Sequence, residues 1–419
     1  MKVDLTVLAI PAFVASMAAE YAWQKRNPAP DRRAGDYEFA DTMASLSMGV
    51  GSLIAPYITD RLLAPLTPRT GRYAKALMGF SLASAAVATA GDVLRRHRGS
   101  GLPEAGTLSS LSSSALPDGE GGATPERDAA IPPALRRITG GSAVSAVAST
   151  VVMVSTLWSA QTASSVLFRR SPLDLGSGPL AYTVGILGWD FLYYWNHRLD
   201  HESRWLWAMH VVHHSSERYN LSTALRQPVA EALTIYVPYG LLSLLGVRPA
   251  IVQDARAVNL IYQFWVHTEA IRTIGPLEKV LNSPSHHRVH HGSNRRYLDR
   301  NHGSILIIWD RLFGTYEPEG EDVVYGLTTN INSYNPLRIA SHEWIAIARD
   351  VFRSETWSDR VGYLVRGPGW AGARQERRGN GREHLPALGG VGAESAGEGA
   401  VQRGGASPTS SPTAWRVGP

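Results

Sequence analysis

The sequence predicts an all-α fold, an integral-membrane multi-helix bundle with a cytoplasmic, histidine-rich helical cap. Long apolar blocks occupy the first two thirds of the 419 residues, strand signals are few, and ten of the 14 histidines lie between positions 197 and 291. Helices of about 20 apolar residues are long enough to cross a bilayer. A membrane bundle that carries a polar cap accounts for both the apolar blocks and the histidines.

Composition limits the kinds of site that the chain can hold. It contains no cysteine, so disulfides and thiolate metal sites are excluded, and any metal must be held by imidazole and carboxylate. The net charge of +5 comes almost entirely from arginine. These arginines are scattered rather than clustered, so we expect charged loops beside a membrane and no nucleic-acid partner.

Five apolar blocks are candidate membrane spans: Leu5–Tyr21, Thr42–Ile58, Ala74–Val93, Gly140–Leu157 and Gly178–Trp195. The basic segment QKRNPAPDRR follows the first block, which favours a retained anchor with an external N-terminus over a cleaved signal peptide. Five spans from that start place the histidines on the cytoplasmic side. The composition, rich in arginine, alanine and glycine, indicates a bacterial protein, so we expect the inner membrane.

Composition shifts divide the chain into four regions. We expect transmembrane helices in residues 1–98 and a disordered Ser/Gly/Pro-rich linker in residues 99–137. Residues 138–345 contain the histidine groups and are the expected catalytic region. Residues 346–419 form a C-terminal segment with a tail predicted to be disordered from about Gly367. Within 229–267 we expect two short helical arms around Gly246–Pro249, which are short for two full spans.

The histidines follow helical spacing. The three groups are His197-x3-His201, His210-x2-His213-His214 and His287-x2-His290-His291, with His286 beside the third group and His267 between the second and third. Residues three or four apart share one face of a helix, so each group can aim two imidazoles at one point. Eight to ten imidazoles exceed what one ion can use, and two ions with four or five nitrogens each fit the count. Imidazole suits zinc, copper, iron and nickel, so ligand type alone does not select the metal.

This pattern resembles the fatty acid hydroxylase and sterol desaturase superfamily of membrane di-iron oxidoreductases. The phrases HHSSERYNLSTALRQ, IYQFWVHTEAIRTIGPLEKVLNSPSHHRVHHGSN and LIIWDRLFGTYEPE are similar to its alkylglycerol monooxygenase branch. The similarity covers about Asp36–Leu63 and Gly178–Tyr334. The chain departs from the family in its Ser/Gly-rich insert, its long tail, and His302, where an aromatic residue is expected.

The resemblance implies a lipid-hydroxylating enzyme that uses dioxygen, two iron ions and an external electron donor. It assigns the iron ligands to His197, His201, His210, His213, His214, His267, His286, His287, His290 and His291. The alkylglycerol branch also implies tetrahydrobiopterin, with Glu202 as a candidate pterin contact. Glu202 is equally explained as an acceptor for a ligand ring or as an exposed helix carboxylate.

The sequence also allows other functions. A sterol or fatty-acid desaturase or hydroxylase uses the same scaffold. A membrane metal-binding or transport protein would spread ionisable residues along several spans. A zinc hydrolase would leave most of these imidazoles unexplained. The substrate lipid, the electron donor and the oligomeric state are not fixed by the sequence.

Four further residues lie near the histidines in the sequence. Arg226 is a candidate to orient substrate or ligands, and equally a candidate ion-pair partner of Glu231 or Glu269. Asp310 and its neighbour Arg311 are predicted to form a local ion pair at the end of a helix. His302 lies close to the third histidine group in sequence, and we assign it no firm role.

Overall fold

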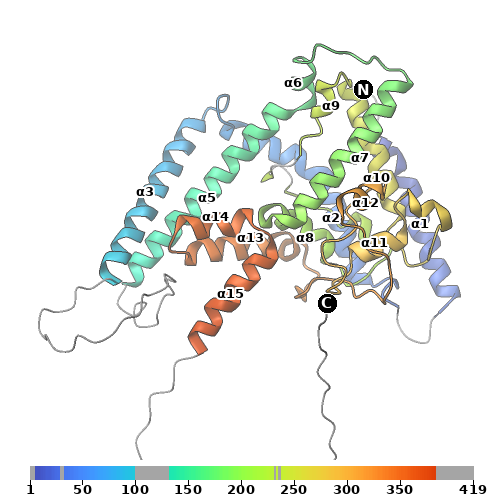
Figure 1. Cartoon of the computed structure of the whole chain (residues 1–419). Coiled ribbons are helices and arrows are strands. Elements are labelled where there is room, and N and C mark those ends of the chain that lie inside the picture. The colour runs from blue at the N-terminus through green and yellow to red at the C-terminus, as the bar shows by residue number, and fades with distance from the viewer. Residues whose placement is uncertain (1–4, 29–32, 100–131, 231–232, 235–236, 384–419) are drawn as a thin grey trace, which may run out of the picture.

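A computed structural model describes residues 5–28, 33–99, 132–230, 233–234 and 237–383, and within these it is helical (Figure 1). The described part contains no strand, and its β contacts are two isolated bridges, Leu281 with Leu306 and Gly292 with Tyr325. The long helices are α1 (Leu5–Arg26), α2 (Phe39–Leu63), α3 (Ala74–Gly99), α5 (Pro133–Thr162), α7 (Pro179–Glu202), α10 (Pro249–Trp265), α13 (Pro336–Arg353) and α15 (Pro368–Glu383). Shorter helices are α6 (Ser164–Phe168), α8 (Arg204–His214), α9 (Leu241–Leu244), α11 (Pro284–His290), α12 (Ile308–Phe313) and α14 (Trp357–Val365), with 3-10 turns at Ala64–Leu66, Thr223–Leu225 and Gly275–Lys279. The predicted all-α fold is confirmed.

Within the part of the chain that the structure describes, three helices are long and apolar enough to cross a membrane: Leu5–Arg26, Ala74–His97 and Pro133–Thr162. They coincide with the first, third and fourth predicted spans. The other two predicted spans are helical too, as α2 and α7, but neither is among these three helices, and Asp190 lies within the apolar run of α7. The structure therefore supports three of the five predicted spans by length and apolar content.

Three segments differ from the sequence prediction. Helix α5 begins at Pro133, where a proline fits because the first turn needs no N–H donor, so the last residues of the predicted linker are helical. The linker residues 100–131 lie outside the described part, as does the tail from 384. The expectation of disorder from Gly367 is wrong for α15. Of the two arms expected in 229–267, the second is helix α10, whereas the described residues of the first include the four-residue α9.

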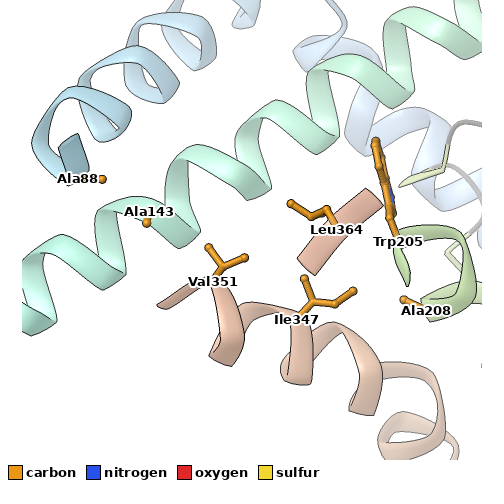
Figure 2. Close-up of a cluster of buried hydrophobic side chains, with 7 residues drawn as sticks. All are labelled: Ala88, Ala143, Trp205, Ala208, Ile347, Val351 and Leu364. Carbon is orange, nitrogen blue, oxygen red and sulfur yellow. The ribbon is translucent and has the colours of Figure 1, made fainter. Parts of the chain in front are cut away.

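The apolar core joins the membrane helices to the cap. Helices α3 and α5 lie side by side, and a methyl group at Gly91 of α3 would collide with Thr139 of α5. Figure 2 shows the buried cluster beside this pair, which comprises Ala88, Ala143, Trp205, Ala208, Ile347, Val351 and Leu364. These residues belong to α3, α5, α8, α13 and α14. Burial of this cluster therefore fixes α8 against the α3–α5 pair.

A second cluster packs the N-terminal half of α7 against α10. Ala181 and Trp189 of α7 pack against Ile251, Val252 and Ala255 of α10. The contact is polar at one point, where Asn259 of α10 donates a 3.3 Å hydrogen bond to Asp190. The two core clusters thus hold α7, α8 and α10 in fixed positions, and these three helices carry or adjoin the first two histidine groups and His267.

Candidate metal centre

Three helices and the residues just beyond a fourth present the histidines to a common region. His197 and His201 lie one turn apart at the C-terminal end of α7, and His210, His213 and His214 occupy the last turns of α8. Helix α11 supplies the third predicted group, with His291 immediately after it. The Ser283 hydroxyl caps α11 by accepting from the His286 amide at 3.5 Å, and Pro284 fits its first turn. His267 lies just beyond the end of α10.

The ring nitrogens form two groups, which we call group A and group B. Group A comprises His197, His201, His210, His214 and His290; group B comprises His213, His267, His287 and His291. Within each group the candidate ligand atoms all lie within 4.8 Å of one another, and every ring except that of His210 is buried. The histidines that are four apart, such as His197 and His201, stay in one group, whereas those that are three apart, such as His287 and His290, fall in different groups. Each doubled histidine is divided: His214 belongs to group A and His213 to group B, and His290 and His291 divide in the same way.

Backbone carbonyls fix the tautomer of several rings. The Nδ1 atoms of His197, His267 and His290 donate to the carbonyl oxygens of His302, Gln263 and Arg300 at 2.8, 2.7 and 2.9 Å. His213 donates to the Arg226 carbonyl at a longer 3.3 Å. A ring that donates through Nδ1 keeps its Nε2 lone pair free for a metal. The arrangement therefore fits metal ligation by these rings, with the carbonyls as supporting acceptors.

The Nε2 atoms meet inside each group. In group A, the Nε2 of His210 lies 2.9 Å from that of His197 and 2.9 Å from that of His214. In group B, the Nε2 of His267 lies 3.0 Å from that of His213 and 2.9 Å from that of His287. Nitrogens bound at about 2.1 Å to one ion lie about 3–4 Å from each other, which these separations approach.

Three other Nε2 atoms are buried with no hydrogen-bond partner, those of His201, His290 and His291. A buried polar atom without a partner costs about 1–3 kcal/mol, so such atoms are rare unless a ligand satisfies them. A cation in each group would satisfy all three. The residues present therefore fit two metal ions, one with five imidazoles and one with four.

Burial keeps these rings in the form that binds metals. The pKa values of His214, His290 and His291 lie well below the usual value, because burial and then the neighbouring imidazoles disfavour the charged form. Burial also lowers the pKa of His267 to about 4. The rings are thus neutral near pH 7, and a neutral imidazole is the species that coordinates a metal.

The structure separates His286 from the other predicted ligands. His286 is buried, its ring packs edge-on against Tyr316 at 5.5 Å between centroids, and it belongs to neither group. Its position follows from helix geometry, because His287 and His290 are three apart and share the face turned toward the groups. We leave His286 out of the proposed ligand set.

Glu202 and His302 lie at the edge of group A. The Glu202 carboxylate is about half exposed and forms a 2.8 Å ion pair with Arg198, one turn earlier on α7. This agrees with the interpretation of Glu202 as an exposed helix carboxylate. His302 is buried 5.0 Å from His201 between ring centroids, and its carbonyl accepts from His197. His302 therefore supports the centre through its backbone.

Sequence reasoning missed or misassigned several supporting groups. Asp299 accepts from the His201 ring at 3.2 Å, and the Arg300 and His302 carbonyls serve two other rings. The predicted Asp310–Arg311 pair is wrong. Asp310 instead accepts from the backbone amides of His302 and Gly303, both at 2.7 Å. Carbonyl acceptors carry no residue signature, so only the unusual density of Asp, Asn and His after the third group could have indicated them.

Comparisons with known proteins agree with this geometry. Residues 182–315 match the family model described as fatty acid hydroxylase. The chain is 47% identical over 192 residues to alkylglycerol monooxygenase from Homo sapiens, covering 46% of this chain and 43% of that protein. It is 46% identical over 187 residues to the Danio rerio protein of that name, covering 45% and 42%. It is 30% identical over 158 residues to ornithine lipid hydroxylase from Rhizobium tropici, covering 36% and 48%.

The chain spans less than half the length of each of these three relatives. No solved structure matches it. The matched segment 182–315 contains every histidine of groups A and B. The chain therefore contains a segment, residues 182–315, that is similar to the fatty acid hydroxylase family.

Proposed function

We propose that this protein is a membrane-bound, di-iron oxygenase that hydroxylates a carbon–hydrogen bond of a lipid with dioxygen. The observation that carries the proposal is the convergence of nine imidazoles into two groups, with three buried Nε2 atoms left without protein partners. The all-nitrogen donor set fits iron, and the relatives named monooxygenase and hydroxylase favour it over other metals that imidazole binds.

The chain's own residues would bind and orient the ions and exclude water. Group A would hold one ion and group B the other. The carbonyls of His302, Arg300, Gln263 and Arg226 would keep the ring tautomers fixed. Two bound irons would supply the activation of dioxygen and the attack on the lipid carbon–hydrogen bond. Burial of the rings keeps bulk water from the reacting species.

The substrate class that we favour is an alkylglycerol, in which the carbon beside the ether oxygen is hydroxylated. The product is a hemiacetal, which collapses to an aldehyde and free glycerol. The matches to alkylglycerol monooxygenases support this choice. We further propose that reduced tetrahydrobiopterin or another external donor supplies the electrons. The Arg198-paired Glu202 is available at the surface as one contact for the donor.

A second candidate is hydroxylation of an ornithine-containing lipid, which the match to ornithine lipid hydroxylase favours. A sterol or fatty-acid desaturase remains the alternative on the same scaffold. For localisation, we propose the bacterial inner membrane, with the histidine groups on the cytoplasmic side. The three candidate spans and the basic residues Lys25 and Arg26 at the end of α1 support this orientation.

The test combines metal analysis with lipid turnover. The full chain is purified in mild detergent, loaded with ferrous iron and assayed with an alkylglycerol and an ornithine lipid, each with and without reduced pterin. We expect about two irons per chain and pterin-dependent aldehyde release from the ether lipid. His213→Ala should lose iron and turnover, whereas the control His342→Ala, which alters a histidine outside both groups, should keep them. A wild-type chain that binds fewer than two irons would refute the proposal.

A further inference from the structure

One loop serves three histidines of group A. Residues 299–302, which we call the 299–302 loop, supply a hydrogen-bond acceptor to each ring's Nδ1. The Asp299 carboxylate accepts from His201 at 3.2 Å, the Arg300 carbonyl from His290 at 2.9 Å, and the His302 carbonyl from His197 at 2.8 Å. These rings come from two helices, α7 and α11, so the loop joins parts of the site that are distant in sequence.

Group B does not depend on this loop in the same way. The His213 ring donates to the Arg226 carbonyl and the His267 ring to the Gln263 carbonyl, within its own helical turn. The supports of the two groups therefore lie in different segments. A change that moves the 299–302 loop should disturb group A and leave group B in place.

The loop has an unusual backbone that needs external support. Asp299 and Asn301 have φ angles of 58° and 55°, in the left-handed region that asparagine and aspartate tolerate better than other non-glycine residues. The Asn301 side chain donates to the carbonyls of His286 at 3.0 Å and Glu317 at 2.7 Å. It also accepts from the Glu317 amide at 2.8 Å. The middle of the loop is thus fixed to α11 and to the segment after α12.

The end of the loop is fixed by Asp310, a fully buried carboxylate in α12. One oxygen accepts from the His302 amide and from the Thr315 hydroxyl, each at 2.7 Å. The other oxygen accepts from the Gly303 amide at 2.7 Å. Three donors converge on one carboxylate, so replacement of either oxygen by an amide NH₂ leaves a buried donor facing another donor.

We propose that Asp310 is a positioning residue for the metal of group A and not for the metal of group B. It holds the 299–302 loop, and the loop in turn holds His197, His201 and His290 in the orientation that turns Nε2 toward the ion. The inference rests on the proposed two-metal function. Loss of such an outer support lowers metal affinity about 10- to 100-fold in other metal sites.

The test measures metal content and affinity for the full chain in mild detergent. The wild type, loaded with ferrous iron and challenged with a graded chelator, should retain two irons per chain. Asp310→Asn should retain one at a chelator concentration that leaves the wild type fully loaded, with an affinity loss of about 10- to 100-fold at the other site. Retention of both irons at wild-type affinity would overturn the inference.

A matched control separates loop positioning from general loss of stability. Asp190 is also a buried carboxylate that accepts from backbone amides, those of Ile305 at 2.7 Å and Leu306 at 3.2 Å, a few residues beyond the loop. Its other donors are the side chains of Asn259 and Trp309, so its hydrogen bonds do not hold a histidine ring. Asp190→Asn should lower the thermal midpoint and keep two irons. Loss of one iron in Asp190→Asn as well would contradict a specific role for Asp310.

Double variants identify which iron is lost. Asp310→Asn combined with the group A change His290→Ala should retain one iron, because both changes affect the same ion. Asp310→Asn combined with the group B change His267→Ala should retain none. The reverse pattern would overturn the inference. A wild-type chain that binds fewer than two irons would instead refute the proposed function, so the two failures are distinguishable.

Discussion

Asp41 of α2 and Arg226, 185 positions later, form a buried ion pair of 2.5 Å, and the carbonyl of the same Arg226 accepts from the His213 ring. The Arg226 guanidinium also contacts Ser45 and Ser215. The pair therefore connects a helix near the N-terminus to group B. It gives Arg226, predicted from the sequence as an orienting residue, a defined position.

Asp41→Asn should weaken group B more than group A. Removal of one partner from a buried ion pair costs about 3–5 kcal/mol, because the other charge is left without compensation. We expect a lower thermal midpoint together with weaker iron binding at one site. Chelator competition measures the second effect. Asp174→Asn, which breaks an exposed pair with Arg248, is the control and should change neither. Equal iron affinity in Asp41→Asn and wild type would contradict the connection.

Neighbouring histidines of α11 should behave differently. His287 belongs to group B, whereas His286 lies outside both groups. His287→Ala should reduce the iron content to about one per chain. His286→Ala should retain two irons and lose mainly the packing of its ring against Tyr316. Elemental analysis of both purified variants decides the point, and loss of iron from His286→Ala would return that residue to the ligand set.

The iron-free protein should lose stability in mild acid. The folded pKa of His267 is about 4, and those of His214, His290 and His291 are lowered as well. The unfolded chain binds protons near pH 6.5, so between that value and about pH 4 it holds more protons than the folded state. Folding stability should then fall by about 1.4 kcal/mol per pH unit for each such ring. Thermal midpoints of chelator-treated protein between pH 7.5 and 5 test this, and a flat profile would refute it.

Trp205 should be a major support of α8. It is buried in the cluster of Figure 2, and its indole nitrogen donates to the Leu233 carbonyl at 2.8 Å. Trp205→Ala should cost about 3–5 kcal/mol through lost burial and a cavity. Trp205→Phe should cost less, because it keeps most of the apolar surface. Detergent-solubilised thermal unfolding measures both, and an unchanged midpoint in Trp205→Ala would contradict the role.

The sequence predicted the helical class and the histidine groups because both have periodic signals. Spacings of four placed His197 with His201 and His210 with His214 on shared helix faces. The same rule did not reveal that His213 and His214 serve different groups. That division depends on how α8 packs between α7 and the segment after α10, which is a tertiary relationship.

The partners of the supporting residues could not be predicted from neighbouring positions in the sequence. Asp310 has Arg311 as its neighbour in sequence, and a local ion pair is the simplest expectation for adjacent opposite charges. Its actual partners are buried amides at 302 and 303, brought to it by the turn of the 299–302 loop. Asp41 likewise gave no sign of its pairing with Arg226. Such long-range contacts follow from packing rather than from sequence spacing.

The coordination shell of the bound iron tests the account most directly. X-ray absorption at the iron edge of the fully loaded wild-type chain reports the number and type of ligands and any second metal nearby. We expect a first shell dominated by four to five imidazole nitrogens per iron, in line with groups A and B. A single iron per chain, or a shell made mainly of carboxylate oxygens, would contradict a paired histidine centre.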